Sequence, residues 1–314
     1  MERALIFAGD SFLGRHLVGA LQAAEWEVLS TSRRGSPGFI VCDLTDAAQV
    51  AEVVKDAGPA LVVQCAGATH ASDPREMVAV HCAGSLNVLE AIREHAPRAM
   101  TVLIGTAAEY GEVPPDQLPV TESQPSRPTS YFGASKVAQT ELARAAAREA
   151  DLAIAVVRPF NILGPGLPSY YAAGRIAQRV RELYVKDGTA ASRETLPVQN
   201  ASATRDFVDI RDVAAAIALV STSPTNPGTF SLFNVATGIE TSILELAQAV
   251  CEEAGGCRAV DAGAGASRTG IDRSCGDATK LRTELGWAPR YTWRQSVADL
   301  WSGDALASGR AASA

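Results

Sequence analysis

The segment SYFGASK, residues 130–136, places a lysine on the same short stretch as two aromatic residues. A proton donor that shares a helix face with a lysine lies four residues before it, because positions i and i+4 are neighbours on a helix. Counting back from Lys136, this position holds Phe132, whose ring carries no acidic proton. Tyr131 carries a phenol, but it lies about 100° around a helix from Phe132, given 3.6 residues per turn. The spacing therefore predicts a proton-transfer face with phenylalanine at the donor position.

A second reactive group is expected after an apolar run, in the segment GTAAEYG at residues 105–111. Thr106 supplies a hydroxyl that can hydrogen bond to a substrate carbonyl or alcohol. Glu109 and Tyr131 are the two side chains that could donate a proton in place of Phe132, and water is a third source. The candidate catalytic residues are therefore Thr106, Glu109, Tyr131, Phe132 and Lys136.

A nucleotide site is indicated by AGDSFLG, residues 8–14, between an expected strand and an expected helix. Glycines in such a turn let the backbone approach a pyrophosphate at a helix N-terminus. Gly14 keeps the third position of the G-x-x-G-x-x-G register, whereas Ala8 and Ser11 take the other two. The segments CDL (42–44) and QCAGA (64–68) support the site, since small residues let a cofactor lie across strand ends. We expect cofactor contacts from Gly9, Ser11, Phe12, Leu13, Gly14, Asp43, Leu44, Ala66 and Gly67.

The choice between cofactors depends on STSRR, residues 30–34, which follows the second apolar run and contains no acidic residue. A carboxylate there favours NAD, whereas an arginine accommodates the additional phosphate of NADP. Arg33 and Arg34 therefore favour NADP(H), with NAD(H) as the alternative. The competing interpretation is that both arginines belong to a solvated surface.

These residues require elements that bring strand ends together. Short apolar runs alternate with Ala/Leu-rich amphipathic runs, a succession that folds into a doubly wound parallel sheet with helices on both faces. Such α/β (Rossmann) folds bind ligands at the carboxyl ends of their strands. The expected strands are residues 4–9, 27–32, 60–67 and 100–106, and the expected helices are residues 14–26, 47–57, 81–96 and 210–220. The pattern is irregular from residue 167 to about residue 205.

Two domains and a tail are expected from this pattern. The dinucleotide-binding Rossmann domain spans residues 1–162, and residues 206–235 return to it. A smaller, mostly C-terminal α/β domain for the substrate comprises residues 163–205 and 236–302. Gly, Ala and Ser dominate residues 303–314, which predicts a flexible tail.

Composition excludes several classes of protein. Lys and Arg number 28 against 35 Asp and Glu, so a net charge of −7 provides no basic field for nucleic acid or an anionic membrane. The apolar run at residues 213–220 is too short to span a bilayer. Six cysteines occur without a C-x-x-C pair, and MERALIFAGD resembles no signal peptide. We therefore expect a reduced, cytoplasmic protein with no metal, membrane or nucleic-acid partner.

Five segments occur in an order that resembles a known family: GTAAEYG, SYFGASK, RPFNILGPG, TRDFVDIRDV and GDATKLRTELGWAP. Together they resemble extended short-chain dehydrogenases/reductases that act on nucleotide sugars, the NAD-dependent epimerase/dehydratase family. The resemblance runs from about residue 3 to about residue 300. Within the family, residues 198–217 and 274–289 most resemble GDP-4-keto-6-deoxymannose reductases.

The resemblance implies roles for the catalytic candidates. Lys136 would bond the nicotinamide ribose and lower the pKa of the neighbouring acid. Thr106 would orient the reacting oxygen, and Phe132 would occupy the place of the proton donor. His81 stands where the family commonly has an asparagine that faces the cofactor, and a structural role is expected for it. Ala107 and Ala108 replace the acidic pair of sugar dehydratases, which argues against dehydration.

The resemblance also implies how the substrate is held. Asn161 would position the sugar or its diphosphate, and Arg205 and Arg268 would clamp the diphosphate, for which a planar guanidinium is suited. Asn161 could instead cap a turn, and Arg205 could instead pair with a neighbouring aspartate. The implied partner is a nucleotide-diphosphate sugar, and the implied assembly is a homodimer.

Phe132 leaves three interpretations open. The chain could be a Tyr→Phe variant made to preserve a substrate complex, a natural enzyme with another proton source, or a non-catalytic nucleotide-binding subunit. We favour the first, because Thr106 and Lys136 remain in register. The expected reaction is NADPH-dependent reduction of a keto-sugar nucleotide, slowed by Phe132. An NAD-dependent nucleotide-sugar epimerase is the alternative.

Overall fold

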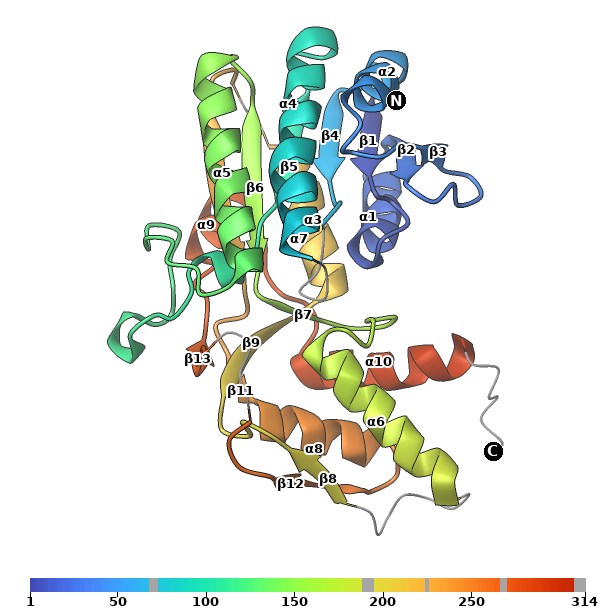
Figure 1. Ribbon diagram of the computed structural model, residues 1–314, viewed down its shortest axis with the longest axis vertical. Coiled ribbons are helices and arrows are strands. Elements are labelled where there is room, and N and C mark those ends of the chain that lie inside the picture. Colours follow the sequence, from blue (N-terminus) through green and yellow to red (C-terminus); the bar gives the residue numbers. More distant parts are fainter. Residues whose placement is uncertain (68–72, 188–194, 224–225, 266–269, 308–314) are drawn as a thin grey trace.

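The computed structural model describes residues 1–67, 73–187, 195–223, 226–265 and 270–307. Figure 1 shows a sheet flanked by helices above a smaller part that carries the helices α6, α8 and α10.

The large sheet has seven strands in the order β10-β6-β5-β4-β1-β2-β3. Every neighbouring pair is parallel, so the predicted doubly wound α/β fold is confirmed. The strands are β1 (Arg3–Phe7), β2 (Glu27–Ser32), β3 (Ile40–Val41), β4 (Leu61–Gln64), β5 (Met100–Ile104), β6 (Ile154–Pro159) and β10 (Phe230–Val235).

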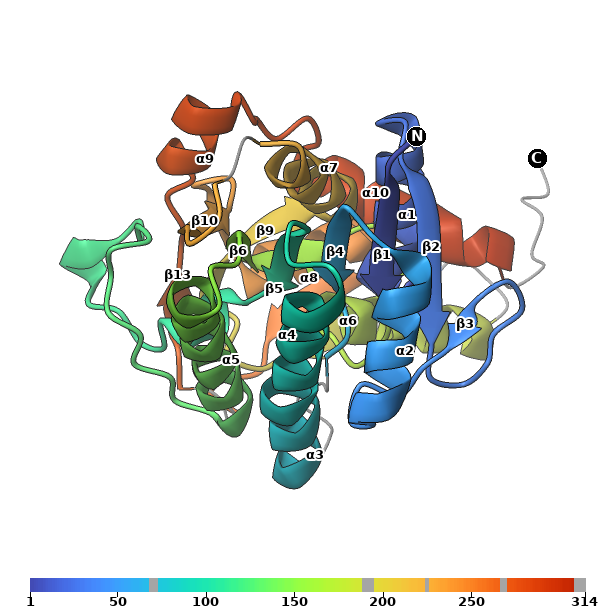
Figure 2. The same cartoon turned by 90° about the horizontal axis from the view of Figure 1, so that it is seen from above.

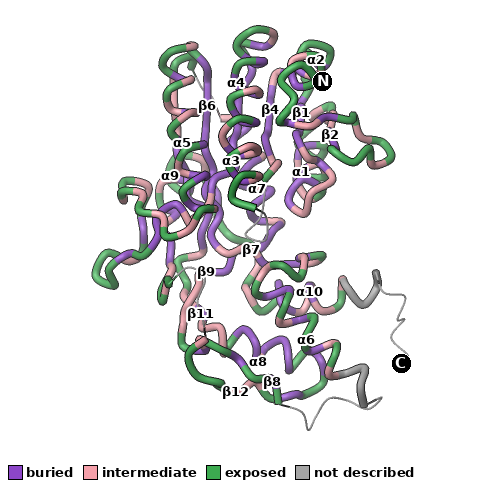
Figure 3. The backbone as a smooth tube through the Cα atoms, in the orientation of Figure 1, coloured by how far each residue is buried: buried purple, intermediate pink, exposed green. Residues whose placement is uncertain are grey.

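Helices cover both faces of this sheet (Figure 2). The helices are α1 (Phe12–Ala23), α2 (Ala47–Ala57), α3 (Pro74–Val78), α4 (Gly84–His95), α5 (Tyr131–Glu149), α7 (Ile210–Ser221) and α9 (Thr279–Leu285). Leu17 and Ile217, from α1 and α7, belong to the core on one face, whereas Val54 and Val88, from α2 and α4, belong to the core on the other. Because both faces are covered, the central strands are buried along their whole length, as Figure 3 shows for β4 and β6.

The smaller part has two sheets and three helices. Its four-stranded sheet consists of β7 (Asn161–Leu163), β9 (Thr204–Asp209), β11 (Glu240–Ser242) and β13 (Arg273–Ser274), and β8 (Thr195–Val198) pairs with β12 (Arg258–Asp261). The helices are α6 (Ala172–Asp187), α8 (Ile243–Glu253) and α10 (Trp293–Ala307). Helix α6 lies inside the segment that the sequence pattern left irregular. The tail expected at 303–314 begins too early, because α10 continues to Ala307, and residues 308–314 lie outside the described residues.

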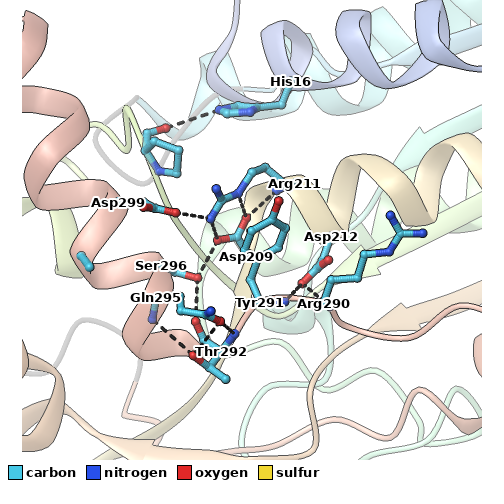
Figure 4. A network of polar contacts seen from close by, with 12 residues as sticks. His16, Asp209, Arg211, Asp212, Arg290, Tyr291, Thr292, Gln295, Ser296 and Asp299 are labelled. Atoms are coloured by element: carbon cyan, nitrogen blue, oxygen red, sulfur yellow. Dashed lines mark hydrogen bonds and ion pairs between the residues drawn. The ribbon is translucent and has the colours of Figure 1, made fainter.

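A polar network joins α10 to the start of α7 (Figure 4). Asp209 caps α7 by accepting from the backbone N–H of Arg211, and its carboxylate also accepts from the Ser296 hydroxyl of α10 at 2.6 Å. The Arg211 guanidinium bonds both oxygens of Asp209 at 2.8 Å and reaches Asp299 of α10 at 2.6 Å. These contacts fix the smaller part against the large sheet.

Two cysteines depart from the expectation of a fully reduced chain. Cys251, in α8, and Cys257, before β12, form a disulfide. They lie six positions apart in the sequence, and the turn after α8 brings their side chains together. The spacing of the cysteines alone did not indicate this contact. Among the described residues, no helix is long and apolar enough to cross a membrane, and no group of three or more His, Cys, Asp or Glu could hold a metal ion.

Candidate active site

A cavity of about 810 Å³ lies at the carboxyl ends of the large sheet. The strand order reverses between β1 and β4, and doubly wound sheets bind ligands at this point. Of the predicted site residues, the cavity is lined by Ser11, Phe12, Leu13, Arg33, Arg34, Asp43, Leu44, Ala66, Gly67, Thr106, Phe132, Lys136, Asn161 and Arg205.

The turn between β1 and α1 fits a dinucleotide. Ser11 caps α1 by accepting from the backbone N–H of Gly14 at 3.1 Å, so the positive end of the helix faces the cavity. Gly14 does not line the cavity, but a Cβ there would lie 2.4 Å from the Ala8 carbonyl oxygen. A Cβ on Gly9 would meet Ser30 at 2.6 Å. Both glycines therefore permit close packing of the turn, while Ala8 adopts a left-handed φ of 60° where the fingerprint has glycine.

The end of the cavity near β2 carries charges of both signs. Arg33 forms an ion pair with Glu76 at 3.5 Å, and both of these side chains are about half exposed. Asp10, which the sequence reasoning missed, accepts hydrogen bonds from Ser32 at 2.7 Å and from Ser36 at 3.0 Å. A carboxylate from the β1 turn therefore reaches the end of β2, although the β2 segment itself contains no acid.

The catalytic candidates lie on two segments of the chain that pack closely against each other. Thr106 follows β5 and caps the short 3-10 helix η2 (Ala107–Glu109). Helix α5 begins opposite, with Ser130 as its N-cap. A Cβ on Gly133 would lie 2.5 Å from the Ala108 carbonyl oxygen, so glycine lets α5 approach η2. Thr106, Phe132 and Lys136 therefore face one cavity, with Phe132 and Lys136 one helical turn apart.

Lys136 is almost fully buried. Its Nζ donates to the Ile104 carbonyl oxygen and to Gln139 Oε1, each at 2.8 Å. Burial lowers the pKa of Lys136 to about 8, and the negative charge of Glu109 opposes part of this shift. Gln139 in turn donates to the Ser85 hydroxyl, which also accepts from Gln64.

The two alternative proton donors lie away from the cavity. The carboxylate of Glu109 is completely buried, where it accepts from the Thr106 backbone N–H, the Thr140 hydroxyl and the Arg158 guanidinium. Tyr131 is 74% exposed at the start of α5. Neither residue lines the cavity, so the structure does not bring them to the reacting position.

His81 lies behind the catalytic face and is fully buried. Its Nδ1 is 2.8 Å from the Ser135 hydroxyl, and its ring meets the Phe132 ring edge-on with centroids 5.7 Å apart. Because Ser135 donates to the Phe132 carbonyl oxygen, Nδ1 is the donor in the contact with Ser135. His81 therefore supports the position of Phe132 from behind.

The opposite end of the cavity is formed by the smaller part. Asn161 follows β6 and donates to the Asp206 carbonyl oxygen at 3.4 Å. Arg205 pairs with no aspartate carboxylate among the described residues, and its guanidinium donates instead to the backbone oxygens of residues 204, 271 and 272. Arg268 lies outside the described residues. Sequence reasoning missed three lining residues that folding brings here from the turn before α6 and its first turns: Tyr170, Tyr171 and Arg175.

This fold and site define a dinucleotide-binding α/β protein with a threonine and a lysine facing the cofactor cavity. The chain belongs to the NAD dependent epimerase/dehydratase family, whose model matches residues 4–236. Members of this family are nucleotide-sugar dehydrogenases, reductases and epimerases that use NAD or NADP.

Similar proteins span nearly the whole chain. A dTDP-6-deoxy-L-talose 4-dehydrogenase (NAD(P)(+)) from Kitasatospora kifunensis is 30% identical, covering 97% of this chain and 96% of its own. The GDP-6-deoxy-D-mannose reductase of Pseudomonas aeruginosa is 27% identical, covering 94% and 95%. Among solved structures, RMD from Pseudomonas aeruginosa complexed with NADPH has a TM-score of 0.82 and 25% identity, covering 96% of this chain and 98% of its own. The Thermus thermophilus UDP-glucose 4-epimerase complex with NAD has a TM-score of 0.82 and 27% identity, covering 96% and 98%.

Proposed function

We propose that this protein reduces a keto-sugar nucleotide with NADPH and that Phe132 slows its turnover. The observation that carries the proposal is the convergence of Thr106, Phe132 and Lys136 on the cavity whose other ends hold Arg33 and Arg205. Two similar proteins support it: the 27% identical relative is a GDP-6-deoxy-D-mannose reductase, and a similar structure is complexed with NADPH.

The two ends of the cavity would bind different ligands, the cofactor at one end and the sugar nucleotide at the other. Arg33 and Arg34 would meet the additional phosphate of the adenosine half, and the N-terminus of α1 would hold the pyrophosphate. Lys136 would bond the nicotinamide ribose. Asn161, Arg205 and Arg268 would hold the sugar diphosphate. Arg205 and Arg268 belong to the proposed substrate segments 163–205 and 236–302, and Asn161 lies just before the first of them.

The residues around the reacting carbonyl orient it but supply no phenolic proton. When bound, NADPH supplies the hydride that reduces the sugar carbonyl carbon. The Thr106 hydroxyl donates a hydrogen bond to the carbonyl oxygen and fixes its direction. The oxygen gains negative charge as the carbonyl is reduced, and it requires a proton. The Phe132 ring fills the donor position without supplying one, so turnover is slow while binding is preserved.

The reversal Phe132→Tyr tests the proposal. A positioned acid contributes about 10²–10⁴-fold in rate, so kcat should rise by about this factor with little change in substrate affinity. The measurement is steady-state turnover over a panel of keto-sugar nucleotides, together with mass spectrometry of nucleotides released from the purified protein.

Tyr131→Phe, made in both backgrounds, is the control. If Tyr131 is the donor, this change abolishes activity and Phe132→Tyr has no effect. Absence of turnover from every variant, with a nucleotide still bound, would favour the non-catalytic binding subunit.

The second candidate is an NAD-dependent nucleotide-sugar epimerase. Asp10 lies in the turn after β1, and its carboxylate reaches the end of β2. It favours the epimerase, because a carboxylate at this place suits the ribose hydroxyls of NAD. Similar structures include a UDP-glucose 4-epimerase complex with NAD. An epimerase retains its cofactor and isomerises the sugar with no net oxidation, whereas the proposed reductase consumes NADPH in proportion to product.

We also propose a homodimer formed through the face of α3, α4 and α5. Exposed apolar or aromatic side chains lie on all three helices: Val78, Leu86 and Tyr131. Analytical ultracentrifugation tests this assembly, and Leu86→Glu should shift the protein toward monomer.

A further inference from the structure

The reacting position lacks a phenol, yet an ammonium group lies one helical turn away. Phe132 and Lys136 line the same cavity, and Thr106 lies across from them. Glu109 and Tyr131 do not line it. Reduction of a carbonyl still needs a proton, so the question is which group on this face can provide it.

The geometry directs Lys136 toward the cavity. Among the described residues, two of its three N–H groups are used by the Ile104 carbonyl oxygen and Gln139 Oε1. These contacts hold Nζ on the cavity side, where a Cβ built on the lining residue Gly67 would lie 3.8 Å from it. One N–H is therefore available to a ligand in the cavity.

The surroundings of Nζ let it release a proton. Its side-chain partner is a neutral amide, and Gln139 is itself fixed by Ser85, so no carboxylate of the described residues contacts the ammonium. The titratable groups that face it are Glu109 of η2, Cys65 after β4, and His81 and Cys82 of the π-helical turn η1 (Ala79–Ala83). Glu109 is already bonded to the Arg158 guanidinium, which offsets its charge.

We propose that Lys136 is the proton donor of this chain and that Gln139 is the residue that positions it. This inference rests on the proposed reductase function. The carbonyl carbon accepts the hydride that a bound reduced nicotinamide would supply. The carbonyl oxygen takes a proton from the ribose hydroxyl that Lys136 would bond, and this hydroxyl takes a proton from Nζ. An O–H bond forms, an N–H bond breaks, and the neutral amine regains its proton from water.

Two residues with phenol side chains also line the cavity, and they are the alternative proton donors. Tyr170 and Tyr171 precede α6, with their ring centroids 4.7 Å apart, and Tyr171 lies 6.3 Å from the Phe12 ring of α1. Burial raises the pKa of both phenols, which makes them weaker acids than Lys136. Their place beside α1 puts them across the cavity from α5.

The first test measures Lys136 without turnover. The chain has four lysines, so NMR of ¹³C-labelled lysine side chains resolves few signals, and Lys136→Arg assigns the one from α5. In the protein without ligand, that signal should titrate near pH 8. Gln139→Glu should move its midpoint upward, because a carboxylate at 2.8 Å stabilises the ammonium. A midpoint above pH 10 that is unchanged by Gln139→Glu would overturn the proposal.

The second test follows kcat against pH in the chain with Phe132 and in its variants. An acid must be protonated to act, so kcat should fall as pH rises through about 8. Gln139→Glu should move this fall to higher pH. Lys136→Arg keeps the cation but cannot release its proton in this range, so kcat should drop about 10²-fold or more and the fall near pH 8 should disappear.

Controls separate the inference from the function on which it rests. Lys55→Arg, on the exposed side of α2, should change nothing. In the Phe132→Tyr background, Lys136→Arg should cost a smaller factor, since a phenol then supplies the proton. If the Phe132 chain is active and Lys136→Arg keeps both kcat and its pH profile, or if Tyr171→Phe removes the fall near pH 8, Lys136 is not the donor and the proposed function stands. If neither the Phe132 chain nor Phe132→Tyr reduces any keto-sugar nucleotide, both proposals fail.

Discussion

At the residue scale, the proposed choice of NADPH rests on a few charged side chains near the end of β2. Arg33 and Arg34 line the cavity beside Asp10, which is bonded to Ser32 and Ser36. Because Asp10 already accepts two hydroxyls, it is less available to a ribose than a free carboxylate would be. The arginines should therefore dominate at this end.

We expect the unmodified chain to bind NADPH at least about tenfold more tightly than NADH, a difference of about 1.4 kcal/mol. Replacing both Arg33 and Arg34 with alanine should remove this preference by weakening NADPH alone, as measured by fluorescence titration. Arg75→Ala is the matched control, since Arg75 is almost fully exposed on α3 and does not line the cavity. Equal affinities of the unmodified chain for the two cofactors would contradict the assignment.

Arg205 lines the other end of the cavity and is the residue proposed to hold the sugar diphosphate. Its guanidinium is held by backbone oxygens of residues 204, 271 and 272, so it is oriented before a ligand arrives. Arg205→Ala should weaken sugar-nucleotide binding by about 2 kcal/mol or more while leaving NADPH affinity nearly unchanged, as measured by calorimetry. Arg273→Ala is the control, because Arg273 pairs with Glu240 outside the cavity. Unchanged sugar-nucleotide affinity would remove Arg205 from the site.

At the scale of elements, the βαβ alternation was readable because buried parallel strands are continuous apolar runs. The ends of the elements were less readable. The expected helix at 81–96 begins inside η1 and becomes α4 only at Gly84. It is preceded by α3, because Asp73 caps a helix that begins at Pro74. Helix α6 was missed although its apolar residues recur at helical spacing, since the turn-rich residues around it obscured the pattern.

The candidate site was predictable only where its residues form local motifs. Thr106, Phe132 and Lys136 could be found from spacing. Asp10 and Tyr171 could not, because each reaches the cavity through contacts with residues far away in the sequence. Folding brings these residues to the cavity, and a single sequence does not indicate which distant residues will contact each other.

The turn into α1 gives a prediction with an internal control. Gly14→Ala should destabilise the protein by about 1–3 kcal/mol, because the added Cβ would overlap the Ala8 carbonyl oxygen. It should also weaken NADPH binding by displacing the N-terminus of α1. Gly19→Ala, in the same helix with nothing within 4 Å of its Cβ, should stabilise by about 0.5–1 kcal/mol. Urea unfolding measures both changes, and equal effects would show that the close approach at Gly14 is unimportant.

At the scale of the whole molecule, the cavity depends on how the smaller part is held against the large sheet. Helix α10 packs against α6, α8, β7 and β9, and its link to α7 runs through Arg211 (Figure 4). The Asp209 carboxylate is fully buried, and a buried charge that loses its partner is strongly destabilising. The Tyr291 ring lies 3.6 Å from the Arg211 guanidinium and covers it. Arg211 is therefore the central residue of the contact between α7 and α10.

Arg211→Met should lower the free energy of unfolding by about 3 kcal/mol, because Asp209 would keep only its hydrogen bonds from Ser296 and the backbone. Asp299→Asn should cost about 1 kcal/mol or less, since Asp299 is 42% exposed and solvent screens its charge. Three of the four tryptophans lie at positions 287, 293 and 301, so their fluorescence reports on this region. In Arg211→Met, the fluorescence transition in urea should precede the loss of far-UV circular dichroism, because α10 is released before the large sheet unfolds. Coincident transitions, with equal costs for the two variants, would mean that packing around α10 and not the Asp209–Arg211 pair holds the two parts together.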